Sequence, residues 1–156
     1  MSIKLRTPEY FMQEALEEAQ KARHFNEVPI GAVVVKDGII IGRGHNTRES
    51  EELSTAHAEI NAIRAASLNI GSWRLTGCEV YVTIEPCPMC TGALYQSRVS
   101  KIYYGAADYK AGACGSLFNL FEIEGLNHYC EVYSGILEKE CQSIISDFFK
   151  SRRFKK

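Results

Sequence analysis

Three side chains that bind transition metals and one carboxylate occur at a spacing typical of hydrolytic enzymes. His57 and Glu59 are two positions apart, and Cys87 and Cys90 follow within the run EPCPMC at residues 85–90. One imidazole and two thiolates suit zinc, and three protein ligands leave the fourth tetrahedral position of the metal to water. Zinc acidifies that water enough to make a nucleophile near neutral pH. The sequence therefore predicts one catalytic Zn2+ ion per chain.

The two cysteines should share one face of a helix. Cys87 and Cys90 are three positions apart at the start of a predicted helix, where free backbone N–H groups favour the thiolate form. In the middle of a helix, His57 and Glu59 would point in different directions. We therefore expect His57 at a helix entry, from which both side chains can face the metal.

Glu59 is the predicted catalytic residue. Two thiolates and an imidazole offset the charge of zinc, so the bound water is acidified less than in an all-histidine site, and a nearby base becomes important. Glu59 can take a proton from the water, pass one to a ring nitrogen of the substrate and then protonate the departing amine. The pattern favours a hydrolytic reaction that replaces an exocyclic amino group by a carbonyl and releases ammonia.

A structural zinc site is the main alternative to a catalytic one. It would need a fourth protein ligand, for which His45 and His128 are the candidates, and neither lies at a spacing typical of zinc fingers. We expect Cys78, Cys130 and Cys141 to be small hydrophobic residues of the core rather than metal ligands.

The elements that must position the metal ligands alternate between strand and helix. Strands are predicted at 31–36 and 39–44, joined by the hairpin signal Asp37-Gly38, and at 79–84, 101–105 and 131–134. Helices are predicted from Thr7 and Pro8 to near residue 26, and at 58–66, 87–96 and 137–150. We expect an α/β fold, a three-layer α/β/α sandwich with a mostly parallel five-stranded sheet and an N-terminal hairpin strand as an antiparallel edge.

Length and composition predict a single domain over residues 1–156. The 156 residues, of which 46% are hydrophobic, suffice for one well-buried core. No apolar run is long enough to cross a bilayer, and the first residues lack the apolar stretch of a secretory signal. These features predict a cytoplasmic protein without a membrane partner, in which cysteines bind metal or are buried rather than paired.

The net charge of −1 conceals a basic end. Residues 147–156 contain five basic side chains and one acidic side chain, interleaved with phenylalanines. This composition suits the phosphates and stacked bases of a nucleic acid. The alternative is the end of a helix whose aromatic residues pack into the core and whose cations are favoured at the C-terminus.

Over nearly its whole length the chain resembles the cytidine and deoxycytidylate deaminase superfamily, and more closely its bacterial tRNA-specific adenosine deaminases. The zinc motif is shared by many deaminases, and the later stretches narrow the choice. The similar stretches are 28–32 (VPIGA), 45–49 (HNTRE), 55–59 (TAHAE), 85–90 (EPCPMC), 105–110 (GAADYK), 115–117 (GSL), 126–128 (LNH), 147–149 (DFF) and 152–153 (RR).

The resemblance implies hydrolysis of adenosine to inosine at the wobble position of a tRNA anticodon, by a cytosolic homodimer with no DNA partner. It implies that His57, Cys87 and Cys90 bind zinc and that Glu59 moves protons. The partner would be the anticodon stem-loop. A base in such a loop is already poorly stacked, so flipping it into a pocket costs little.

The resemblance also implies residues that bind the substrate. The side chain of Asn46 would bind the flipped base, the backbone amide of Ala58 would hold the oxygen that forms on the ring, and Val28 and Pro86 would belong to the same pocket. The implied RNA-binding residues are Asp108, Lys110, Asn127, His128, Phe149, Arg152 and Arg153. Structural roles remain the alternatives for several of them: Asn46 as the cap of a turn, Asp108 and Lys110 as a solvated pair, and His128 as a core or surface histidine.

Two other functions remain open. A deaminase of a free base or nucleotide, such as guanine, cytosine or deoxycytidylate, would use the same chemistry and need no basic end. A non-catalytic, zinc-stabilised RNA-binding module would bind RNA without releasing ammonia. Glu59→Ala separates this module from a deaminase of either kind, because binding would survive in every case, whereas ammonia release would disappear only if the carboxylate moves protons.

Overall fold

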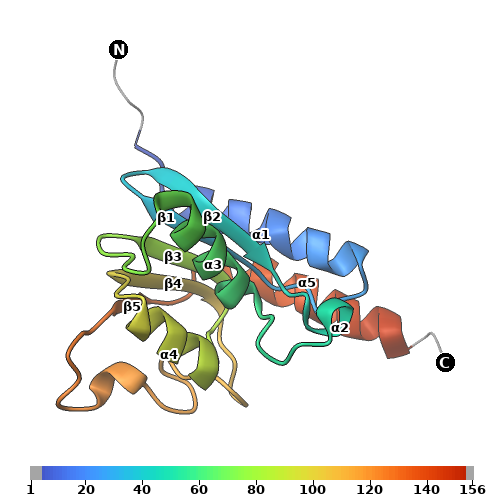
Figure 1. Cartoon of the computed structure of the whole chain (residues 1–156). Coiled ribbons are helices and arrows are strands. Elements are labelled where there is room, and N and C mark those ends of the chain that lie inside the picture. The colour runs from blue at the N-terminus through green and yellow to red at the C-terminus, as the bar shows by residue number, and fades with distance from the viewer. Residues whose placement is uncertain (1–4, 154–156) are drawn as a thin grey trace.

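The computed structural model describes residues 5–153, which form a five-stranded sheet between two layers of helices (Figure 1). The strands are β1 (Gly31–Lys36), β2 (Ile39–His45), β3 (Glu79–Ile84), β4 (Lys101–Ala106) and β5 (Glu131–Tyr133). The helices are α1 (Pro8–His24), α2 (Arg48–Glu51), α3 (Ala58–Ile70), α4 (Pro88–Gln96) and α5 (Glu138–Arg153), with a 3-10 turn η1 at Leu120–Glu122. None of the helices in this range has the length and apolar character needed to span a bilayer.

The order of the strands is β2-β1-β3-β4-β5. Strand β1 runs antiparallel to both β2 and β3, whereas β3, β4 and β5 are parallel. All strands except β1 therefore point the same way, which confirms the mostly parallel sheet with one antiparallel hairpin strand. The antiparallel strand is not at the edge where we expected it. It lies inside the sheet, because β3 pairs with the side of β1 that faces away from β2.

Alternate residues of β1 contribute to two separate cores. Val33 and Val35 pack against α1 and α5 on one face, and Ala32 and Val34 pack against α3 on the other. Successive side chains of a strand point to opposite faces, so a strand covered on both sides reads as a continuous apolar run. In Figure 1, α3 and α4 lie in front of the sheet and α1 and α5 lie behind it. The predicted three-layer α/β/α sandwich is confirmed.

Helix α3 lies close against β2 because two residues of that strand have no side chain. A Cβ atom on Gly44 would lie 2.4 Å from the backbone nitrogen of Ala62, and one on Gly42 would lie 2.6 Å from its carbonyl oxygen. A methyl group at either position would therefore displace the helix. Gly42 and Gly44 set the distance between the sheet and the helix that carries Glu59.

The helices begin in two different ways. Thr7 caps α1, and its side-chain oxygen accepts a hydrogen bond from the backbone N–H of Tyr10, as predicted from the Thr-Pro start. His57 and Cys87 are the N-cap residues of α3 and α4, and neither side chain makes a capping hydrogen bond. The first N–H groups of these two helices are therefore left for other partners.

The differences from the predicted elements are local. Helix α3 continues past residue 66 to Ile70, where Gly71 ends it in a left-handed conformation with φ 68°. Helix α2 and the turn η1 were not predicted, because such short segments with no buried residue show no apolar period. Cys78, Cys130 and Cys141 are buried, as expected. The end of the basic segment, residues 154–156, lies outside the described residues.

Candidate metal centre and substrate pocket

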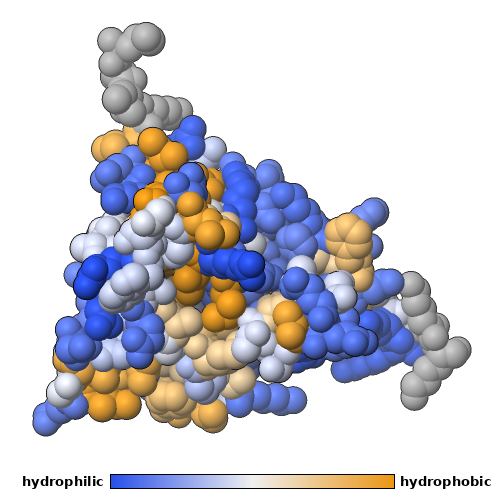
Figure 2. Space-filling view, in the orientation of Figure 1, coloured by the Kyte–Doolittle hydropathy of each residue, from blue (hydrophilic) through white to orange (hydrophobic). Residues whose placement is uncertain are grey.

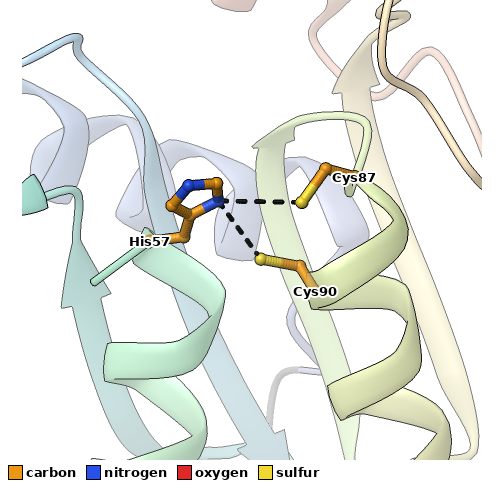
Figure 3. A group of neighbouring side chains, drawn as sticks. All are labelled: His57, Cys87 and Cys90. Carbon is orange, nitrogen blue, oxygen red and sulfur yellow. Dashed lines mark hydrogen bonds between the residues drawn. The ribbon is translucent and has the colours of Figure 1, made fainter. Parts of the chain in front are cut away.

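His57, Cys87 and Cys90 converge from the starts of α3 and α4 (Figure 3). The Nδ1 atom of His57 lies 3.7 Å from Sγ of Cys87 and 3.5 Å from Sγ of Cys90. With ordinary Zn–N and Zn–S bond lengths, nitrogen and sulfur donors on a tetrahedral zinc ion lie roughly 3.6 Å apart. The residues therefore fit zinc in both the identity and the spacing of their donor atoms.

Within residues 5–153, these three residues are the only group of three or more His, Cys, Asp or Glu side chains arranged to hold a metal. The two candidates for a fourth ligand have other contacts. Nδ1 of His45 lies 3.4 Å from a carboxylate oxygen of Glu18, and Nε2 of His128 lies 2.7 Å from the carbonyl oxygen of Val99. The centre thus keeps the open position that is typical of catalytic rather than structural zinc.

The ionisation of each thiol depends on the other. Hydrogen bonds from the Cys90 thiol and the His57 ring lower the pKa of Cys87 to about 4. The hydrogen bond with Cys87, burial and the nearby carboxyl group of Glu59 raise the pKa of Cys90. The hydrogen bond with Cys87 also raises the pKa of His57. One thiolate is therefore favoured without a metal, and the charge of zinc would favour the second.

Glu59 lies in the first turn of α3, and only 3% of its surface is exposed. Burial raises the pKa of its carboxyl group to about 7. The carboxyl group lies close enough to the thiol of Cys90 to raise the pKa of that thiol, but it does not belong to the group that can hold the metal. A carboxyl group whose pKa lies near neutral pH can both accept and return a proton, which is what a proton shuttle requires.

A cavity of about 150 Å³ opens beside His57, between the start of α3 and the segments that precede β1 and α2. Drug-sized ligands occupy cavities of about 300–1,000 Å³, so this one has room for a small part of a ligand, such as a single planar base. The cavity is lined by Val28, Ile30, Asn46, Arg48, His57 and Ala58. Four of these, Val28, Asn46, His57 and Ala58, were predicted site residues.

Pro86 is the predicted substrate-binding residue that does not line this cavity. It is buried just before Cys87. Its carbonyl oxygen accepts hydrogen bonds from the backbone N–H of Ala113 at 2.9 Å and from the hydroxyl group of Thr91 at 3.3 Å. Its contacts therefore join the metal-binding segment to neighbouring backbone.

Asn46 is a pocket residue and also holds the pocket wall together. Its Nδ2 group donates to the carbonyl oxygen of Val28 at 3.3 Å, and its Oδ1 atom accepts from the backbone N–H of Arg48 at 3.1 Å. The side chain therefore does stabilise a turn, which was the structural alternative for it. A carboxamide has two N–H donors and two acceptor sites, so it can also bind a substrate.

Glu27 fixes the helix that contributes Arg48 to the cavity. Its carboxylate, in a residue that is 1% exposed, accepts hydrogen bonds from the backbone N–H groups of Glu49 and Ser50 and from the Ser50 hydroxyl group, at 3.1, 2.7 and 2.7 Å. Burial alone would raise the pKa of Glu27, but these hydrogen bonds outweigh it and lower the pKa. Sequence reasoning missed both Glu27 and Arg48, although they flank or lie within the quoted stretches 28–32 and 45–49.

The predicted RNA-binding residues lie outside the lining of this cavity, on three separate segments. The Oδ1 atom of Asp108 accepts hydrogen bonds from the backbone N–H groups of Lys110 and Ala111, both at 3.1 Å, so this carboxylate shapes a turn from which Lys110 projects into solvent. Asn127 is exposed and accepts a hydrogen bond from the hydroxyl group of Tyr95. His128 is half-buried through its contact with the backbone described above.

The exposed end of α5 carries Phe149, Arg152 and Arg153. The preceding Phe148 is buried, and the guanidinium group of Arg152 lies 4.8 Å from the centre of its ring. Arg152 also lines a cavity of about 650 Å³ together with Arg23 of α1. The structural alternative, in which an aromatic residue of the basic end packs into the core, thus holds for Phe148, whereas Lys150, Arg152 and Arg153 are exposed. Sequence reasoning missed Arg23, because a lone arginine in a helix belongs to no motif.

The model of the cytidine and deoxycytidylate deaminase zinc-binding region matches residues 5–106. A Bacillus subtilis protein described as a tRNA-specific adenosine deaminase is 53% identical over 148 residues, which are 95% of this chain and 92% of the relative. A Haemophilus influenzae protein with the same description is 47% identical over 149 residues, 95% of this chain and 86% of the relative.

Solved structures agree with this relationship. A chain from a study of A-to-I editing by tRNA:A34 deaminases at the wobble position of transfer RNA matches with a TM-score of 0.84 and 45% identity, over 86% of this chain and 98% of that chain. A guanine deaminase from Nitrosomonas europaea, with a TM-score of 0.81 and 24% identity over 94% and 86% of the two chains, shares the fold. With its open zinc-binding group and a sequence match over residues 5–106, the chain belongs to the cytidine and deoxycytidylate deaminase family.

Proposed function

We propose that this protein, acting as one domain in the cytoplasm, hydrolyses adenosine to inosine at the wobble position of a tRNA anticodon. The proposal depends on one observation above all. An open His57, Cys87 and Cys90 centre lies beside the buried Glu59, in a chain that is 53% identical to a relative described as a tRNA-specific adenosine deaminase. Zinc, when bound by the three ligands, would act as a Lewis acid that activates a water molecule as the nucleophile.

Glu59 moves the protons of the proposed reaction. Its carboxyl group, with a pKa of about 7, accepts a proton from the attacking water and donates it to the ring nitrogen. It then accepts the second proton, from the hydroxyl group that has formed on the ring, and donates it to the departing amine. The C–N bond breaks, the carbonyl of inosine replaces the amino group, and ammonia leaves. The backbone N–H of Ala58, in the first turn of α3, stabilises the oxygen that forms on the ring, because the start of a helix favours negative charge.

The cavity beside His57 receives the base. Asn46 hydrogen-bonds to the base and Val28 contacts its face, while Pro86 acts through the backbone that it fixes next to Cys87. A cavity of about 150 Å³ leaves the ribose and the phosphates outside. The flipped base therefore enters alone, and the rest of the anticodon loop lies across the protein surface.

The RNA contacts are proposed for exposed or half-buried side chains on the three segments that lie outside the lining of this cavity. Arg152 and Arg153 contact backbone phosphates, and Phe149, 43% exposed, offers a stacking surface at the end of α5. Asp108 and Lys110 together form a second proposed contact with the RNA, and Asn127 and His128 form a third. Their proposed role is to position the loop, since phosphate contacts fix orientation rather than read sequence.

We further propose that two copies of the chain associate through a face formed by α4 and residues 117–123. Figure 2 shows hydrophobic side chains gathered over this part of the molecule. Contiguous exposed apolar surface is typical of interfaces, whereas single exposed apolar residues are ordinary. Phe118→Ser is therefore expected to give a monomer in sedimentation experiments, and a dimer that survives would contradict this interface. The exposed large apolar residues of this face are Met89 at 36%, Leu117 at 59%, Phe118 at 42% and Ile123 at 48%.

The direct test is incubation of the zinc-loaded protein with a tRNA whose anticodon begins with adenosine, followed by nuclease digestion and a search for inosine. A tRNA with guanosine at that position is the substrate control, and Glu59→Gln is the enzyme control. We expect inosine only with the first tRNA and the unmodified protein. Release of ammonia from free guanine, cytosine or deoxycytidylate, with tRNA left unchanged, would support the small-substrate alternative instead.

A further inference from the structure

A buried carboxylate joins the metal-binding segment to the loop after β4. Glu85 is 2% exposed, and its two oxygens share four donors. One oxygen accepts from the backbone N–H of Asp108 at 3.1 Å and from the hydroxyl group of Ser116. The other accepts from the backbone N–H groups of Cys114 and Ser116, at 3.1 and 3.0 Å. The ion pairs formed by residues 5–153 do not include Glu85. Loop amides, rather than a cation, balance its charge.

The main chain strengthens the same junction. The backbone N–H of Ala113 donates to the carbonyl oxygen of Pro86 at 2.9 Å. A Cβ atom on Gly112 would lie 2.2 Å from a carboxylate oxygen of Glu85, so only glycine allows the loop to close around this side chain. The loop at 107–116 therefore wraps around a residue whose backbone continues directly into the zinc ligand Cys87.

Most other hydrogen bonds of this loop are local, such as the one from the backbone N–H of Gly112 to the carbonyl oxygen of Asp108 at 2.8 Å. Residues 111–115 read AGACG, a run of small side chains that loses much backbone entropy on ordering and buries little apolar surface. Hydrogen bonds to an ionised group are about twice as strong as neutral ones. The Glu85 carboxylate thus supplies the acceptors that a run of small residues needs.

We propose that Glu85 is a positioning residue, which fixes the loop at 107–116, and with it Asp108 and Lys110, relative to the metal centre. The inference rests on the proposed function, because it assigns to this loop a part in binding the anticodon. Glu85 takes no part in proton transfer or metal binding. Its effect is on the binding of RNA, through the conformation of the loop.

Glutamine at this position keeps the size of the side chain and halves its acceptors. Each carboxylate oxygen of Glu85 accepts two hydrogen bonds. In one orientation the amide nitrogen of glutamine would face the backbone N–H groups of Cys114 and Ser116. In the other it would face the backbone N–H of Asp108 and the Ser116 hydroxyl group, which can turn to accept, so at least one donor is left without an acceptor. We expect Glu85→Gln to bind one zinc per chain with kcat little changed. Its KM for tRNA should rise roughly tenfold or more, as for buried donors left unsatisfied.

Amide hydrogen exchange measures directly how well the loop is held in its conformation. In Glu85→Gln, the amides of Cys114 and Ser116 should lose protection while those of β1 keep theirs. Val35→Ala is the control for a general loss of stability: it truncates a core residue of β1 that pairs with Glu79, at the opposite end of β3. At a matched fall in Tm, Val35→Ala should leave both the KM for tRNA and the loop protection unchanged.

Two variants on the loop side test the same contact if Glu85→Gln does not fold. Gly112→Ala pushes a methyl group toward the carboxylate, and Ser116→Ala removes one donor while leaving the charge in place. Both should raise KM without loss of zinc, with Ser116→Ala giving the smaller effect. A variant that keeps loop protection and KM, or one that loses protection with no change in KM, overturns the inference.

Failure of the proposed function would look different. If the unmodified protein leaves adenosine-containing tRNA unchanged, the proposed function is wrong, and so is the RNA-binding part of this inference. Loss of protection at Cys114 and Ser116 in Glu85→Gln would still support the positioning of the loop by this carboxylate.

Discussion

The Nδ1 atom of His57 lies 3.5 Å from Sγ of Cys90, although the two residues are 33 positions apart. This contact brings together the first turns of α3 and α4, which follow different strands of the sheet. Metal bound here would link two helices that the fold otherwise joins only through side-chain packing. Metal binding and folding stability should therefore be coupled.

Removal of zinc is expected to abolish activity and lower Tm, and added zinc should restore both, because a ligand that binds the folded state stabilises it by mass action. Cys90→Ser should have a similar effect, since a serine hydroxyl group does not ionise near neutral pH. Metal content by atomic absorption and Tm by calorimetry measure the two results. Cys130→Ser, a change at a buried cysteine outside the metal group, is the matched control. Full zinc content and activity in Cys90→Ser would rule out the assigned ligand.

Glu59→Gln should keep its zinc and lose activity. Loss of a general acid and base costs about 10²- to 10⁴-fold in kcat, and the amide of glutamine cannot carry a proton between groups. Single-turnover rates with tRNA, measured together with metal content, provide the test. Glu79→Gln, at the far end of β3, serves as the control. A Glu59→Gln protein that retains most of its kcat would exclude the proton shuttle.

Asn46→Asp should lower kcat/KM by about 5- to 150-fold, which corresponds to about 1–3 kcal/mol for a buried hydrogen bond that is left unmade. The substitution replaces the donor to the carbonyl oxygen of Val28 by an acceptor. Asn69→Asp is the control, because Asn69 makes the same type of bond, from Nδ2 to the carbonyl oxygen of Ile41 at 2.9 Å, away from the pocket. Equal effects of the two variants on kcat/KM would contradict a role of Asn46 in substrate binding.

Arg152→Ala and Arg153→Ala should raise the KM for tRNA and leave kcat unchanged. Each lost phosphate contact should reduce the slope of log affinity against log salt by about one. Arg64→Ala changes an exposed cation of α3 and is the control. Point substitutions are preferable to deletion of the C-terminal segment from residue 148, because Phe148 is buried and its loss would destabilise the fold. An unchanged salt dependence in both variants would remove α5 from the RNA interface.

Glu27→Gln should change how stability depends on pH. Burial alone would raise the pKa of Glu27, but hydrogen bonds from Ser50 and Glu49 lower it from 4.5 in the folded protein. A group with a lowered folded-state pKa contributes stability that is present above its unfolded-state pKa and is lost as the pH falls through the folded-state value. Below pH 4.5, the unfolding free energy of the unmodified protein should therefore fall more steeply than that of Glu27→Gln. Denaturant titrations across this range measure the difference, and parallel curves would contradict it.

The metal group could be predicted from the sequence because its chemistry depends on residue type and short spacing, both of which are visible in the chain. The three layers could be predicted because apolar periods differ between helices and strands. The position of β1 inside the sheet could not, since a fully apolar strand pairs equally well on either side. The parts played by Glu27 and Glu85 were hidden for another reason. Most of their partners are backbone N–H groups of segments distant in the sequence, and every residue except proline possesses such a group.

His57 and Cys87 each occupy the N-cap position of a helix without capping it. Serine, aspartate or asparagine at such a position contributes about 1 kcal/mol. A screen that rewards thermal resistance alone, in metal-poor medium, should therefore select His57→Asp or Cys87→Ser, and the selected proteins would be more robust but inactive. At these two positions, the residue type that gives the highest thermal stability differs from the residue type that catalysis requires.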